Sequence, residues 1–104
     1  MSANPIPEGS FAEVGPGLRM HYHSLGEGPV ILFLHGSGPG ASGWSNFHPN
    51  AKIFAENGYR CILPDSLGYG LSSKPTDTLY TLDFMAGAAL KLMDRLGVLR
   101  FTIV

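Results

Sequence analysis

The clearest pattern in the chain is an uninterrupted apolar run followed by a dense set of glycines. Residues 30–34 (VILFL) do not alternate, are rich in β-branched and aromatic side chains, and are too few for a typical helix. Such a run predicts a strand buried on both faces. His35 ends the run, and the glycines that follow are Gly36, Gly38, Gly40 and Gly43. Because open α/β sheets bind ligands in loops at the carboxyl ends of their strands, residues 30–46 predict a ligand site.

The stretch before this strand predicts two antiparallel strands. Ser10–Val14 fits a short strand, and Leu18–Ser24 alternates between an apolar face and a face that carries Arg19, His21 and His23. We expect the second face to be solvated. The two histidines have the spacing of a metal-binding pair, but no adjacent cysteine or carboxylate completes a ligand set, so we predict no metal site.

A helix and a second buried strand are predicted after the glycines. Apolar residues recur at helical spacing from Phe47 onward. Proline is tolerated in a first helical turn, so we expect this helix to begin near Pro49 and to end with Gly58 as its C-cap residue. Residues 59–64 (YRCILP) predict the strand, and Asp65 stands at its carboxyl end.

A second helix and a third buried strand complete the pattern. Thr81 can cap the start of the helix and Gly97 can close its end. Residues 101–104 predict the strand. Because a parallel strand at the end of the chain would leave apolar surface and backbone hydrogen-bonding groups uncovered, we expect that the chain is the N-terminal piece of a larger domain. Alternating strands and helices predict an α/β fold with a mostly parallel sheet. The apolar face of the second helix is predicted to comprise Leu82, Met85, Ala86, Ala89, Met93 and Leu96.

Composition narrows the classes of function. Residues 1–9 contain two prolines and predict a flexible arm, which leaves residues 10–104 as part of one domain. Seven basic and eight acidic residues without a basic cluster argue against nucleic-acid or polybasic membrane binding. The N-terminus lacks a signal-peptide pattern and no apolar stretch has membrane-spanning length, so we expect a cytoplasmic protein. Cys61, the single cysteine, lies in an apolar run and is expected to be a buried small hydrophobic residue.

Two motifs carry a resemblance to a known family. Residues 35–46 (HGSGPGASGWSN) resemble the α/β-hydrolase superfamily, and within it the meta-cleavage product hydrolases. These enzymes hydrolyse a carbon–carbon bond in 2-hydroxy-6-oxo-hexa-2,4-dienoates from aromatic degradation. Residues 64–72 (PDSLGYGLS) are similar to the D-x-x-G-x-G-x-S segment after the fourth strand of these enzymes. The resemblance implies the N-terminal portion of an α/β-hydrolase fold, with antiparallel first strands, then a mostly parallel sheet with flanking helices.

The resemblance also implies roles for residues of the glycine loop. The backbone amide of Ser37 is expected to donate a hydrogen bond to the substrate oxyanion, and Gly36 and Gly38 are expected to set the loop geometry. Asn46 matches an asparagine that contacts the polar end of the dienoate. The implied ligand is therefore a small-molecule dienoate, with no cofactor and no metal.

Other residues near the motifs are expected to be structural. His35 is expected to orient the loop rather than to act as the base, and Asp65 is expected to anchor a loop. Trp44 and Phe47 could line an apolar pocket, but packing against the helix is the more frequent outcome for such residues.

The nucleophile, acid and base of a serine hydrolase are not expected in this chain. In the resembled enzymes the nucleophilic serine lies in a G-x-S-x-G elbow immediately after the fifth strand, which here is residues 101–104. Ser42, Ser45 and Ser72 each have a glycine two residues before them but none two residues after. The remainder of the hydrolase domain, in the same polypeptide or as a separate chain, is therefore an expected partner, and we also expect a homo-oligomer.

Three alternatives remain open. An esterase, epoxide hydrolase or dehalogenase would share the same early scaffold, and the chain could equally be an inactive fragment. A dinucleotide-binding half-fold is matched formally, because Gly36, Gly38 and Ala41 fit G-x-G-x-x-A and Asp65 follows the next strand. We disfavour that fold because a helix that begins only near Pro49 would not present its amides to a pyrophosphate at the loop.

Overall fold

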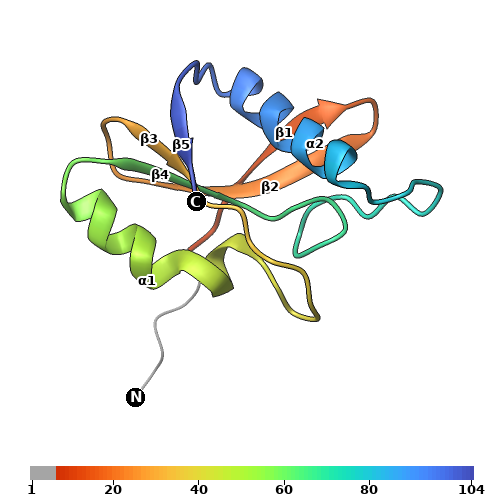
Figure 1. Cartoon of the computed structure of the whole chain (residues 1–104), viewed down its shortest axis with the longest axis horizontal. Helices are drawn as coiled ribbons and strands as arrows, with labels where there is room; N and C mark the ends of the chain where they lie inside the picture. Colours follow the sequence, from red (N-terminus) through yellow and green to blue (C-terminus); the bar gives the residue numbers. More distant parts are fainter. Residues whose placement is uncertain (1–6) are drawn as a thin grey trace.

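The computed structural model describes residues 7–104, so most of the predicted arm, residues 1–9, lies outside the described residues. Strands and helices alternate after an initial hairpin (Figure 1). The elements are β1 (Ser10–Gly15), β2 (Leu18–Leu25), β3 (Val30–Leu32), α1 (Gly43–Glu56), β4 (Arg60–Pro64), α2 (Leu82–Arg95) and β5 (Phe101–Ile103).

The strands form one mixed sheet in the order β1-β2-β4-β3-β5. β1 pairs with β2 and β2 with β4 in antiparallel fashion, whereas β3 pairs in parallel with both β4 and β5. The predicted change from antiparallel first strands to a mostly parallel sheet is therefore confirmed. No helix within residues 7–104 combines the length and apolar character needed to cross a membrane.

The two helices cover opposite faces of the sheet (Figure 1). Successive residues of β4 point to opposite faces, so Ile62 packs in the core under α2 while Cys61 and Leu63 pack in the core under α1. In β3, Leu32 lies on the α2 side and Ile31 on the α1 side. Both strands are thus buried on both faces, as their unbroken apolar runs predicted.

Helix α1 begins six residues earlier than predicted, at Gly43 instead of near Pro49. The Ser42 hydroxyl accepts a hydrogen bond from the Ser45 amide, and the Ser45 hydroxyl accepts one from the Ser42 amide, which forms a capping box. Pro49 therefore lies inside the helix, where its missing N–H leaves one carbonyl without its usual intrahelical partner. The C-cap residue is Asn57, one residue before the predicted Gly58, which follows the cap with a positive φ of 92°.

The apolar face predicted for α2 is only partly correct. The helix itself is confirmed, and its N-cap Thr81 accepts a hydrogen bond from the Phe84 amide. Leu82, however, is 88% exposed, because the face that packs on the sheet is rotated toward residues outside the predicted stripe. The buried residues of the helix are Ala88, Ala89, Leu92 and Met93.

β5 is not the fully buried strand that the sequence predicted. Its side chains are half-buried or exposed, with Ile103 56% exposed. Within residues 7–104 it pairs only with β3, so one edge of the strand has no neighbouring strand.

The predicted solvated face of β2 is wrong at His21 and His23, which are each only 5% exposed, whereas Arg19 is exposed. His21 Nδ1 lies 3.0 Å from Asp65 Oδ2, and His23 Nε2 donates to the carbonyl of Pro7 at 2.8 Å. The ring of His23 also lies 4.8 Å from that of Trp44. Among residues 7–104 no group of three His, Cys, Asp or Glu side chains is arranged to hold a metal.

Candidate active site

The glycine loop leaves the sheet directly beyond β3. The Phe33 amide donates to the Ile62 carbonyl and the Leu34 amide to the Val104 carbonyl, both at 3.0 Å, so sheet-like pairing extends to Leu34. His35 is the first residue outside this pairing. Beyond it the backbone turns at Gly38, whose carbonyl accepts from the Ala41 amide at 3.1 Å, and the loop runs into the N-cap of α1.

Both ring nitrogens of His35 are used within the protein. The Ser66 amide donates to Nε2 at 3.0 Å, which makes Nε2 the unprotonated nitrogen, and Nδ1–H then donates to the Gly36 carbonyl at 2.6 Å. The ring also meets the Tyr69 ring edge-on at 5.1 Å between centroids. His35 therefore joins the glycine loop to the loop that follows β4, and neither nitrogen is available to act as a general base.

The hydrogen bond to Gly36 orients the amide of Ser37. The Gly36 carbonyl and the Ser37 N–H belong to the same trans peptide plane, in which they point in opposite directions. Fixing the carbonyl on His35 therefore directs the N–H away from that ring. Within the described residues this N–H has no backbone acceptor, and Ser37 is exposed at the wall of a cleft. An amide with these properties can donate to an oxygen of a ligand.

The loop from Asp65 to Ser72 is closed by hydrogen bonds at its two ends. Asp65 Oδ2 accepts from the Leu71 amide at 3.1 Å and pairs with His21, while Oδ1 accepts from the Gly43 amide at 3.1 Å. The Ser72 hydroxyl donates to the Asp65 carbonyl and accepts from the His21 amide at 2.8 Å. The carboxylate thus joins β2, the start of α1 and its own loop.

The second glycine of the D-x-x-G-x-G-x-S motif is required by the fold of this loop. Gly70 has φ of 52°, and a Cβ placed on it would lie 2.2 Å from Asp65 Oδ2. Any side chain there would push against the carboxylate that closes the loop.

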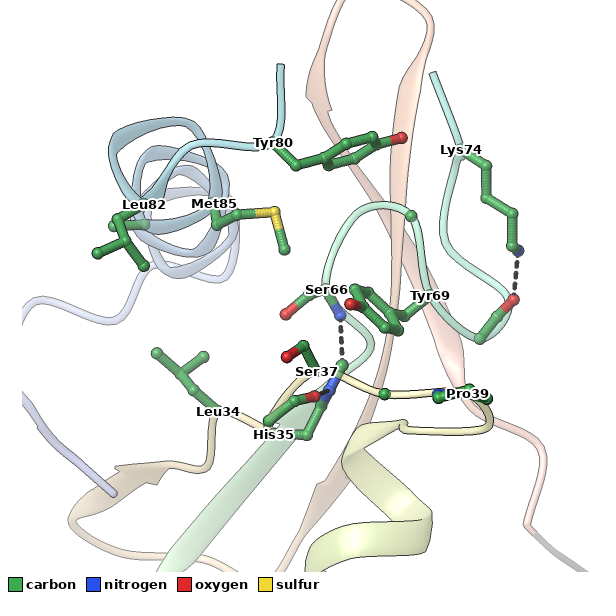
Figure 2. A pocket seen from close by; sticks show the side chains of 15 residues that line it. Leu34, His35, Ser37, Pro39, Ser66, Tyr69, Lys74, Tyr80, Leu82 and Met85 are labelled. Carbon is green, nitrogen blue, oxygen red and sulfur yellow. Dashed lines mark hydrogen bonds between the residues drawn. The ribbon is translucent and has the colours of Figure 1, made fainter. Parts of the chain in front are cut away.

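A cleft of about 1080 Å³ opens between the glycine loop, the Asp65–Ser72 loop and the start of α2 (Figure 2). Its polar side carries Ser37, Ser66 and Tyr69, and Leu34, Leu82 and Met85 supply apolar side chains. Lys74 also lines the cleft, whereas no Asp or Glu side chain does so within the described part of the chain. Such a cleft suits a ligand with an apolar body and an oxygen-bearing polar group.

The structure brings together some of the predicted site residues and not others. Gly36, Ser37, Gly38 and His35 all line the cleft. Asn46 is exposed in the first turn of α1, where its Oδ1 accepts from the Ser45 hydroxyl at 3.3 Å, and it is not among the residues that line the cleft. A role of Asn46 in binding the dienoate therefore stays a prediction.

Two aromatic residues of α1 pack rather than line this cleft. Trp44 and Phe47 lie against the core on the α1 side of the sheet, as expected for the more frequent outcome. Trp44 additionally stacks on His48, with 5.1 Å between ring centroids and 12° between ring planes.

Tyr69, Leu82 and Met85 are cleft residues that sequence reasoning missed as site residues. Leu82 and Met85 were predicted to belong to the core because their helical spacing matches that of packing residues. Tyr69 offered a signal, since it lies between the two motif glycines in a loop predicted to be near the site.

The sequence and the fold place the chain in a family. The alpha/beta hydrolase fold family model matches residues 29–104, and the chain belongs to this family. A late helix start does not exclude a dinucleotide-binding fold, because α1 begins at Gly43 instead of near Pro49; the family assignment decides against that fold.

Individual relatives narrow the similarity. The chain is 44% identical over 96 residues to a 2-hydroxy-6-oxononadienedioate/2-hydroxy-6-oxononatrienedioate hydrolase of Burkholderia vietnamiensis, covering 91% of this chain and 33% of that protein. It superposes on a mutant of CumD, a meta-cleavage product hydrolase of Pseudomonas fluorescens, with a TM-score of 0.84 and 30% identity, covering 91% of this chain and 34% of that one.

An epoxide hydrolase from Vigna radiata superposes similarly, with a TM-score of 0.81 and 36% identity over 92% of this chain and 30% of that one. The chain spans about a third of the length of these relatives. The predicted resemblance to meta-cleavage product hydrolases is confirmed.

Proposed function

We propose that this chain forms the oxyanion-binding side of a hydrolase that cleaves a carbon–carbon bond in 2-hydroxy-6-oxo-dienoates. The observation that carries the proposal is the Ser37 amide, which lies at the wall of a cleft lined by both family motifs and whose peptide plane His35 fixes through the Gly36 carbonyl. The 44% identity to a hydrolase named for a dienedioate substrate supports this substrate class.

The proposed chemistry gives this chain a binding and stabilising role. When a nucleophile attacks the 6-oxo carbon, the carbonyl oxygen gains negative charge, and the Ser37 N–H donates to it. Gly36 and Gly38 allow the loop to place that amide, and Asn46 is proposed to contact the polar end of the dienoate. The nucleophilic serine, the base and the acid are proposed to come from the remainder of the hydrolase domain, in the same polypeptide or in a separate chain.

Ser42, Ser45 and Ser72, the serines that do not fit a G-x-S-x-G elbow, are not available as alternative nucleophiles. Ser42 and Ser45 form the capping box of α1, and Ser72 closes the Asp65 loop. The structural use of these hydroxyls supports placing the nucleophile elsewhere in the domain.

The direct test is turnover by the complete hydrolase. Loss of the coloured dienoate, monitored by absorbance, is expected with 2-hydroxy-6-oxononadienedioate. Hydrolysis of simple esters without turnover of any dienoate would reject the carbon–carbon substrate while leaving the hydrolase fold intact.

Epoxide hydrolysis is the second candidate function, because the Vigna radiata epoxide hydrolase covers as much of the chain at higher identity than CumD does. Supplying the same preparation with an epoxide separates the two functions. Diol formation without loss of dienoate would favour this alternative.

Two further expectations stay predictions. The protein is predicted to be cytoplasmic and to form a homo-oligomer. Cell fractionation tests its location, and light scattering of the complete hydrolase tests its oligomeric state.

A further inference from the structure

The Asp65–Ser72 loop carries two hydroxyls that the fold does not use. The Ser72 hydroxyl donates to the Asp65 carbonyl and accepts from the His21 amide, and the Tyr80 hydroxyl donates to the Pro75 carbonyl. By contrast, the hydroxyls of Ser66 and Tyr69 have no hydrogen-bond partner within residues 7–104, although both residues line the cleft. Within the described residues these two groups are therefore available to a ligand.

Ser66 and Tyr69 are both held against His35, the residue that fixes the peptide of the proposed oxyanion donor. The Ser66 amide is fixed on His35 Nε2 at 3.0 Å, and the Tyr69 ring is fixed edge-on against the same imidazole. Ser37, Ser66 and Tyr69 all line the cleft near His35 (Figure 2). The closed loop beneath them limits their movement, because Asp65 and Ser72 tie it to β2.

The surroundings of the hydroxyls select the chemistry of a ligand group. Hydroxyls donate to acceptor oxygens, and their hydrogen bonds to carboxylates are stronger than those to neutral groups. No Asp or Glu side chain within the described residues lines the cleft to repel an anion, and the lining residue Lys74 is cationic, with its ammonium donating to the Gly70 and Ser72 carbonyls. An anionic oxygen of the ligand is therefore compatible with this side of the cleft.

We propose that the hydroxyls of Ser66 and Tyr69 form a subsite for a carboxylate at the end of the acyl group of the substrate. The inference rests on the function proposed above, which places the reacting carbonyl at the Ser37 amide and assigns the polar end of the dienoate to Asn46. The acyl group on the other side of the carbonyl then remains for the two hydroxyls. The substrate class becomes a dienedioate, with a carboxylate at each end, in preference to a dienoate with an apolar acyl group.

The test compares substrates that differ in the acyl group. In the complete hydrolase, kcat/KM is measured for 2-hydroxy-6-oxononadienedioate and for 2-hydroxy-6-oxo-6-phenylhexa-2,4-dienoate. The ratio of the two kcat/KM values gives the preference for the carboxylate substrate. A second ratio is measured with 4-nitrophenyl hemisuccinate and 4-nitrophenyl butyrate, whose acyl groups differ in a terminal carboxylate. Tyr69→Phe is expected to lower the preference for the carboxylate substrate about tenfold, and the double variant with Ser66→Ala further, as expected for lost hydrogen bonds to a charged group.

Tyr59→Phe is the matched control, because Tyr59 lies next to the C-terminal end of α1 and does not line the cleft. It is expected to leave both ratios unchanged. Equal kcat/KM losses for both members of each pair in Tyr69→Phe, or no loss for either, would overturn the subsite.

The two proposals fail separately. If the enzyme cleaves dienoates and Tyr69→Phe does not change its preference between the two acyl groups, the carbon–carbon activity stands and the subsite is rejected. If the enzyme cleaves only the esters and Tyr69→Phe abolishes its preference for the hemisuccinate, the subsite stands and the carbon–carbon activity is rejected.

Discussion

At the scale of single residues, the imidazole of His35 links the two motifs of the site. It accepts from the loop after β4 and donates to the loop after β3, so the position of each loop depends on the other. A histidine in this state contributes through geometry, since neither of its nitrogens can exchange a proton with substrate without breaking one of these bonds.

Replacing His35 tests this role. In the complete hydrolase, His35→Ala is expected to lower kcat by about 10- to 100-fold, less than the roughly 10²–10³ for outright loss of an oxyanion donor, because Ser37 remains but is poorly oriented. Steady-state kinetics measure the change. His48→Ala, at an exposed histidine of α1, is the control. An unchanged kcat in a folded His35→Ala variant would contradict the orienting role.

Asp65 contributes to the stability of the fold, because its carboxylate accepts hydrogen bonds from three donors in separate parts of the chain. Asp65→Ala would leave the Gly43 amide, the Leu71 amide and His21 without their acceptor. We expect the free energy of unfolding to fall by about 3–5 kcal/mol, as for other broken buried pairs. Urea unfolding of the complete hydrolase provides the measurement.

Asp94→Ala is the matched control for this change, because Asp94 is exposed on α2. Its effect is expected to stay within about 0.5 kcal/mol. Similar losses in the two variants would show that Asp65 does not hold the loops together.

At the scale of elements, the Asp65–Ser72 loop behaves as a rigid unit although it contains no helix or strand. Its shape depends on Gly70, where positive φ and the nearby carboxylate both exclude a side chain. Gly87 offers the opposite case, since a Cβ there meets nothing within 4 Å in the interior of α2.

The pair gives a prediction with opposite signs. Gly70→Ala is expected to lower the free energy of unfolding by about 1–3 kcal/mol, through strain and displacement of Asp65. Gly87→Ala is expected to raise it by about 0.5–1 kcal/mol, because alanine favours the helix. Chemical denaturation of the complete hydrolase checks both values, and a stabilising Gly70→Ala would refute the proposed need for glycine.

The elements that the sequence predicted well are those whose signals are local. Apolar runs predicted β3 and β4, and Thr81 and Gly97 bracketed α2. The predicted start of α1 is wrong because proline usually marks a first helical turn, whereas the capping box at Ser42 begins the helix despite the cost of the internal Pro49.

The misjudged faces depend on contacts between distant segments. Alternation in β2 indicates two faces, but not that the segment following β4 and the start of α1 cover the face that carries His21 and His23. The glycine loop could be predicted from its motif, yet the contribution of Tyr69 to the cleft depends on how the Asp65–Ser72 loop folds back toward His35.

At the scale of the whole molecule, the described residues leave apolar side chains in solvent on α2 and β5. Leu82 is 88% exposed, Leu90 53% and Ile103 56%. Large apolar side chains left exposed in this way are typical of an interface. It supports the proposal that the remainder of the hydrolase domain covers these elements.

Dye binding by the isolated chain and by the complete hydrolase tests whether the remainder of the domain covers these apolar side chains. Residues 1–104 alone are expected to bind an apolar fluorescent dye and to self-associate, because these side chains remain exposed. The complete hydrolase is expected to bind far less dye per molecule. Equal dye binding in the two preparations would contradict coverage by the remainder of the domain.

The position of Cys61 gives these experiments a common reporter. Its thiol is fully buried in the central strand β4, with Sγ 3.5 Å from the Ala51 carbonyl, and burial raises its pKa. A thiol reagent can therefore modify Cys61 only after the sheet separates from α1. Where this opening is fast and reversible, the modification rate measures its free energy without denaturant. Chemical labelling of the single cysteine thus measures the free energy with which α1 is held on the sheet.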